Sequence, residues 1–422
     1  MLTSSQSARM LATSFVLMLA ASCTAWVPAP VEPYWQGRLD VAETIFRERL
    51  ETSDGDWALF ANELATTLEA RGEVDEAWRL FFDAGRLMEN WDASFGDRVA
   101  AVAGREDSRE YRGEPYERAL NSIYTGLLSF ARGEPDNARA SFREAMLRDA
   151  EQSDEQFASD FAPSFFLAAW ASRAAGDRNE ARAYIDEARK ARADAVRFGA
   201  RGAASPSVFD AFEGSNLLVM ASVGRGPSKV ADRHRPDLVR IDVPRQHVRA
   251  ARVYVDGRYR GTTEVLGDVA YQARTRGGRW LDGVRAGKAV FSEVASTAGT
   301  VLLLEGLDRE DGGLLLAGGI ALLASLLVNS DADLRCWRTL PDTLQVLALD
   351  VAPGEHELFI DFVGDDGQVD RAYSRSYTIR LPPRDAASAR DATSVVHVRS
   401  LPLEASLRAR TEVSAPRPGG QS

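Results

Sequence analysis

The feature that most constrains the fold is a recurring pattern of small and bulky residues in the first half of the chain. In three places a glycine is followed five residues later by alanine, then by a bulky apolar residue and a second alanine. The members are Gly72, Ala77, Phe81, Ala84; Gly133, Ala138, Phe142, Ala145; and Gly176, Ala181, Ile185, Ala188. Such recurrence is typical of helical repeat arrays, whose stacked units share one core. Arrays of this kind bind other chains more often than they catalyse reactions, so the pattern favours an interaction protein.

The clearest unit, residues 57–90, has the pattern of two helices separated by a turn. Apolar residues recur at helical spacing on both sides of Arg71-Gly72-Glu73. Gly72 fits a helix C-terminus, where a left-handed residue is needed and glycine adopts that conformation most freely. Ala77 and Ala84 are small enough for paired helices to approach closely, and Phe81 fills the space between neighbouring pairs.

This unit resembles a tetratricopeptide repeat in its alanine, glycine and aromatic positions. Ala61 departs from that family's pattern, which prefers tryptophan there. Units at 115–149 and 163–195 keep the same positions, and half a unit is present at 37–46. The resemblance implies an all-α helical array over residues 34–203. A generic helical bundle is the alternative interpretation.

The N-terminus has the layout of a bacterial lipoprotein signal. Residues 11–21 are apolar, of signal-peptide length and too short to span a bilayer as an ordinary helix. They lead into Leu19-Ala20-Ala21-Ser22-Cys23, which resembles a lipobox with Ala20 where leucine is preferred. The resemblance implies a signal peptide at 1–22, a lipid on Cys23 and a Pro-rich spacer at 23–33. Thr24 in place of aspartate favours the outer membrane, facing the periplasm. An ordinary cleaved signal is the alternative.

Strand-like patterns replace the helical ones after residue 203. A buried apolar run at 217–221, a hairpin around Asp256-Gly257 and further alternating segments predict a small β-sandwich-like domain over 204–382. A helical insertion is expected at about 264–332. Within it, Gly312–Val328 carries no charge and is at the lower limit for crossing a bilayer. Packing against the sheet and contact with a membrane are both open interpretations. Residues 383–422 are predicted to be a mostly disordered tail, which makes the fold class α+β.

The order of these features resembles a family of uncharacterised bacterial envelope lipoproteins. The resemblance rests on the lipobox, the helical units, a Gly-Pro-x-Lys turn, an apolar helical insert and the motif Arg335-Cys336-Trp337-Arg338-Thr339-Leu340-Pro341 before a Pro-Gly-x-His hairpin. It implies an architecture and a location in the cell envelope. It implies no catalytic residues.

The residues that could catalyse a reaction or bind a metal form no recognisable motif. The four histidines, His234, His247, His356 and His397, lie far apart and have no metal-ligand spacing. Gly287-Lys288 lacks the serine or threonine of a phosphate loop. If Cys23 is lipidated, Cys336 has no disulfide partner within the chain. We therefore expect no enzyme activity, no cofactor and no metal site.

Charge narrows the class of partner. The net charge is −11, and residues 34–200 carry 33 acidic against 22 basic residues, which accounts for all of it. An acidic array lacks the clustered cations that nucleic acids require. It predicts a protein partner with basic patches and an association weakened by salt. The sequence thus predicts a lipid-anchored envelope scaffold with a partner in the concave face of its array. Two alternatives stay open: an outer-membrane activator of peptidoglycan synthesis, and an envelope polymer-processing enzyme.

Overall fold

The computed structural model describes residues 28–53, 55–89, 110–150, 160–231, 239–277, 333–383, 391–402 and 411–414. Cys23 and Gly312–Val328 lie outside these ranges, so the predictions of lipidation and membrane contact concern residues that the structure does not describe. Within the described ranges, no helix combines the length and the apolar character needed to cross a membrane.

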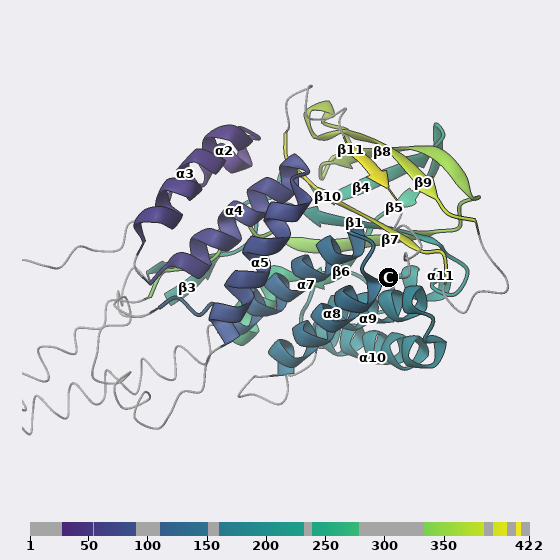
Figure 1. The fold of residues 1–422 in the computed structure, drawn as a ribbon, viewed down its shortest axis with the longest axis horizontal. Coiled ribbons are helices and arrows are strands. Elements are labelled where there is room, and N and C mark those ends of the chain that lie inside the picture. Colours follow the sequence, from purple (N-terminus) through teal and green to yellow (C-terminus); the bar gives the residue numbers. More distant parts are fainter. Residues whose placement is uncertain are drawn as a thin grey trace, which may run out of the picture.

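Helices occupy the first half of the chain and pack one against the next. They are α2 (Glu32–Trp35), α3 (Leu39–Thr52), α4 (Trp57–Arg71), α5 (Val74–Glu89), α7 (Pro115–Ala131), α8 (Pro135–Ala150), α9 (Ala162–Ala175), α10 (Arg178–Arg197) and α11 (Val208–Ala211). Contacts join α3 to α4 and continue in order to α9 and α10. Figure 1 shows this succession from the purple α2 and α3 to the teal α10. The N-terminal part is therefore a helical array.

Recurring glycines end the first helix of each pair. Gly72 and Gly176 follow α4 and α9 with φ of 84° and 95°, and Gly133 has φ of 80° soon after α7. The Gly72 N–H donates to the Glu69 carbonyl, and the next N–H donates to the Leu68 carbonyl. A left-handed conformation costs an L-residue about 1–2 kcal/mol, which explains why glycine recurs at these positions.

The recurring alanines and bulky residues lie where neighbouring helices touch. Almost no surface of these side chains is exposed: Ala77, Phe81, Ala84, Ala138, Phe142, Ala145, Ala181, Ile185 and Ala188 are all buried. Gly126 of α7 shows how tight this packing is. A Cβ atom there would lie 2.4 Å from the Phe142 ring of α8, so only glycine allows the ring to approach α7.

The strands of the described residues form two sheets and a separate strand pair. Their bounds are β1 (Leu217–Val223), β2 (Ser228–Ala231), β3 (Val239–Asp242), β4 (Ala250–Val255), β5 (Arg258–Thr262), β6 (Glu264–Asp268), β7 (Thr343–Leu349), β8 (Gly354–Val363), β9 (Arg375–Leu381), β10 (Ser394–Arg399) and β11 (Thr411–Ser414). The first sheet has the order β10-β1-β7-β6, the second has β11-β9-β8-β4-β5, and β2 pairs with β3. Two short helical segments, α12 (Val269–Gln272) and η3 (Ala273–Gly277), follow β6.

The first sheet is a middle layer between the helices and the second sheet (Figure 1). Because side chains alternate along a strand, β1 contributes side chains both to the core beside the helices and to the core beside the second sheet. Leu217, Val219 and Ala221 belong to the core shared with the second sheet, whereas Leu218 and Met220 belong to the core shared with the helices. All seven residues of β1 are buried, as expected for a strand covered on both faces.

Two boundary predictions are wrong. Glu264–Asp268, which sequence reasoning placed in the helical insertion, forms β6 and pairs with β7. The predicted disordered tail contains β10, which pairs in parallel with β1 inside the core. Its apolar residues, Val395, Val396 and Val398, are buried. A strand of six residues between Ala-, Ser- and Arg-rich stretches changes the local composition too little to be recognised.

Candidate functional site

The inner face of the helical array is covered by the chain itself. The inner helices α4, α7 and α9 are buried along nearly their whole length, and Tyr116–Phe130 of α7 is buried without exception. The first sheet covers part of this face. Residues 333–341, an irregular segment that we call the strap, contact α4 and α7 on the same face. Among the described residues, the chain itself therefore lies against the face where a partner was predicted.

Two buried glutamates hold the backbone of the strap. Glu117 of α7 accepts the Trp337 N–H at 2.6 Å. Glu63 of α4 accepts the N–H groups of Arg338 and Thr339 at 2.7 and 3.1 Å. Burial raises the pKa of Glu63 to about 7 and also raises the pKa of Glu117. Backbone N–H groups that would otherwise lack acceptors in the core are satisfied in this way.

Trp337 is the main anchor of the strap. Its side chain is fully buried and lies with ring centroids 5.6 Å from Phe81 and 5.7 Å from Tyr124. The indole N–H lies within hydrogen-bond distance of Thr339 Oγ1 at 2.9 Å and Thr66 Oγ1 at 3.2 Å. The strap thus joins residues of α4, α5 and α7 in one cluster.

A second buried cluster joins the array to the first sheet. Glu69 of α4 lies 2.6 Å from Nδ1 of His397 and also pairs with Arg399, both on β10. Nε2 of His397 lies 2.8 Å from Oγ of Ser222 on β1, which in turn lies 3.3 Å from the Tyr124 hydroxyl. Burial would raise the pKa of Glu69, but Arg399 and His397 outweigh it and hold that pKa at about 2. The carboxylate is therefore ionised in the folded protein at neutral pH.

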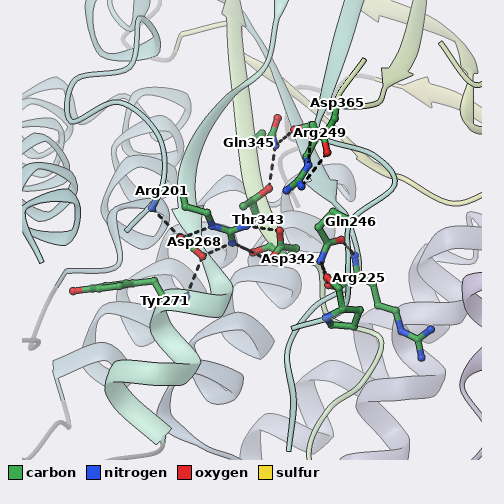
Figure 2. A network of polar contacts seen from close by, with 12 residues as sticks. Arg201, Arg225, Gln246, Arg249, Asp268, Tyr271, Asp342, Thr343, Gln345 and Asp365 are labelled. Carbon is green, nitrogen blue, oxygen red and sulfur yellow. Dashed lines mark hydrogen bonds and ion pairs between the residues drawn. The ribbon is translucent and has the colours of Figure 1, made fainter. Parts of the chain in front are cut away.

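Arg201 makes a third connection, in which a partly exposed guanidinium meets two buried carboxylates. Figure 2 shows its guanidinium between Asp268, at the end of β6, and Asp342, just before β7. The closest ion-pair distances are 2.5 Å to Asp268 and 2.7 Å to Asp342. Asp268 also accepts the Tyr271 N–H at the start of α12. Arg201 follows α10, so this pairing fixes the end of the array against the first sheet.

An open groove lies between α5, α7 and α8. It has a volume of about 360 Å³. Its lining includes Phe82, Gly85 and Met88 of α5, Asn121 and Thr125 of α7, and Ser141 of α8. Phe82 is 43% exposed, and Leu87 of the same helix is 41% exposed. We call this the α5–α8 groove.

The floor of the α5–α8 groove is formed by polar side chains that are held by hydrogen bonds within the chain. The Asn121 amide nitrogen donates to Asn62 Oδ1 at 2.7 Å and to the Phe81 carbonyl at 2.9 Å. Its amide oxygen points at α5, where a Cβ atom on Gly85 would lie 2.7 Å away. The Ser122 and Thr125 hydroxyls donate to carbonyls one turn earlier in α7. Asn121 is only 2% exposed, so its amide oxygen lies at the buried base of the groove.

The residues predicted from the repeat pattern position this groove without lining it. None of the repeat-defining glycines, alanines and bulky residues is among its lining residues. The signal that sequence reasoning missed is the doublet Phe81-Phe82. Adjacent helical residues point in directions about 100° apart, so Phe82 is exposed when Phe81 is buried. Among the described residues, no group of three or more potential metal ligands is found.

Comparisons with known proteins do not identify a family for this chain. No family model and no curated protein matches the chain. Among solved structures, a crystal structure of MamA overlaps 41% of this chain and 99% of its own, with 15% identity and a TM-score of 0.22. A second MamA structure overlaps 40% of this chain and 91% of its own, with 14% identity and a TM-score of 0.21.

Proposed function

We propose that this chain is a non-enzymatic interaction scaffold that binds a segment of another protein in the α5–α8 groove. The observation that carries the proposal is the contrast between two surfaces: the inner face is filled by the strap and the first sheet, whereas the groove is open. Its volume lies within the usual range of ligand clefts. An exposed aromatic residue beside a preformed pocket is also typical of binding hot spots.

Site-specific cross-linking tests the scaffold proposal. A photoreactive residue replacing Phe82 in the full-length chain is expected to cross-link to another protein in intact cells. The same residue replacing Val41 on α3 is the control, because Val41 is also apolar and exposed but lies outside the groove. Equal yields at the two positions, or products only with the chain itself, would contradict the proposal. Recovery of a peptidoglycan synthase would support the narrower alternative of a synthesis activator.

We further propose that a lipid on Cys23 holds the scaffold at the cell envelope, in the outer membrane and facing the periplasm. The lipobox-like residues before Cys23 and the prolines after it support this location. Lipoproteins of this kind carry several acyl chains, and stable anchoring needs more than one. Cys23→Ala is expected to move the protein from the membrane fraction to the soluble fraction. Unchanged membrane retention would instead point to Gly312–Val328.

One observation favours the enzyme alternative. Ser222, His397 and Glu69 follow one another in the hydrogen-bond order of a serine–histidine–acid triad. Ser222 is only 2% exposed, however, and Glu69 is shared with Arg399. We therefore expect no labelling of Ser222 by a fluorophosphonate probe, with Ser222→Ala as the background control. Stoichiometric labelling that Ser222→Ala abolishes would favour the enzyme.

A further inference from the structure

We infer that the partner segment which enters the α5–α8 groove is acidic and apolar. This inference rests on the proposed function and reverses the partner chemistry that overall composition predicts. The array as a whole is acidic, but the residues that line the groove are the ones an occupant would contact directly. The charged groups of the groove itself are Arg86, Arg118 and Arg148 against Glu89 and Glu144.

Both glutamates of the groove are already paired. Arg148 of α8 lies 3.1 Å from Glu89 of α5 and 2.5 Å from Glu144 of its own helix. The Arg148 side chain is only 13% exposed, so this bridge closes one end of the groove. This guanidinium offsets one of the two carboxylate charges, and the three arginines and two glutamates that line the groove carry a net charge of +1.

Arg86 is able to bind an anionic group of a partner. It is exposed, it lines the groove, and no ion pair joins it to another residue of the described ranges. It lies four residues after Phe82 on α5, so the guanidinium and the exposed ring occupy the same face, one turn apart. An occupant that complements these two residues puts an apolar side chain against Phe82 and a carboxylate against Arg86.

The floor of the groove indicates that the occupant is polypeptide. The Asn121 amide oxygen lies beside Gly85, and an amide oxygen has two lone pairs for hydrogen bonds. A peptide backbone supplies N–H donors along its whole length. Since the Asn121 amide nitrogen is already used on Asn62 and Phe81, the side chain presents an acceptor in a fixed orientation.

Charge variants combined with the Phe82 cross-linker test this inference. Arg86→Glu is expected to lower the cross-linking yield about tenfold, because a carboxylate would then face a carboxylate. Arg86→Gln should give an intermediate yield. Arg258→Glu is the control: it makes the same charge change on an exposed arginine of β5, outside the groove and on another element than Phe82. Its yield should stay near that of the unmodified chain.

Mapping the cross-linked peptide separates the two proposals. A partner segment with net negative charge within a few residues of the cross-link supports the inference. A basic segment, or a yield that Arg86→Glu leaves unchanged or raises, overturns the inference while the scaffold proposal stands. Absence of any product with another protein at position 82 overturns the scaffold proposal itself.

Discussion

Replacing Trp337 with alanine is expected to lower the free energy of unfolding by about 3–5 kcal/mol. The indole is fully buried and contacts the rings of Phe81 and Tyr124. Removing it leaves a cavity in the middle of the cluster and takes away the hydrogen-bond donor that faces Thr66 and Thr339. Because the strap links the array to the strand β7 that follows it, we expect both parts to lose stability together.

Urea unfolding followed by far-UV circular dichroism measures this loss. Trp57→Ala is the control, because Trp57 is a tryptophan at the start of α4 that is only partly buried. Its loss should be clearly smaller. A loss below about 1 kcal/mol for Trp337→Ala, which is usual for surface positions, would mean that the strap does not fill the inner face in solution.

The repeat pattern allowed much of the array to be predicted because its causes are local. Gly72 ends a helix in a left-handed conformation that side chains disfavour, and this requirement is visible in the sequence alone. Ala77 and Phe81 are buried because of their positions on one helix face. Local preferences of this kind survive in any tertiary context that keeps the helix pairs.

The strap and the groove could not be predicted because their causes are not local. Arg338 and Glu63 meet although 275 residues separate them along the chain, and no sequence pattern indicates such a pairing. The motif around Trp337 was recognisable as a motif, but its place against α4 and α7 was not. From the sequence alone, the inner face of a repeat array is interpreted as a binding surface, because the distant segment that covers it cannot be identified. The sequence also does not show that Glu89 and Glu144, which lie on different helices, share the guanidinium of Arg148.

Replacing Glu69 with alanine is expected to cost about 3–5 kcal/mol, because it leaves the Arg399 guanidinium buried without its carboxylate. The Glu69 and Arg399 side chains are 9% and 5% exposed. Glu355→Ala is the control: Glu355 pairs with Arg380 on the surface, where both side chains are well exposed. Exposed pairs contribute about 0–1 kcal/mol, so this variant should be nearly neutral.

The pH dependence of stability distinguishes the Glu69 pair from simple loss of packing. In the folded protein the pKa of Glu69 is about 2, against an ordinary value of 4.5. A carboxyl group with a lowered folded-state pKa stabilises the fold above its unfolded value, and this contribution is lost as pH falls from 4.5 toward 2. The difference in unfolding free energy between wild type and Glu69→Ala should therefore be largest above pH 5 and shrink below pH 4.

Combining Glu69→Leu with Arg399→Met should recover part of the lost stability, because removing both partners leaves no buried charge unpaired. A difference that stays constant with pH, or a double variant no more stable than Glu69→Ala, would show that the carboxylate acts only by filling space.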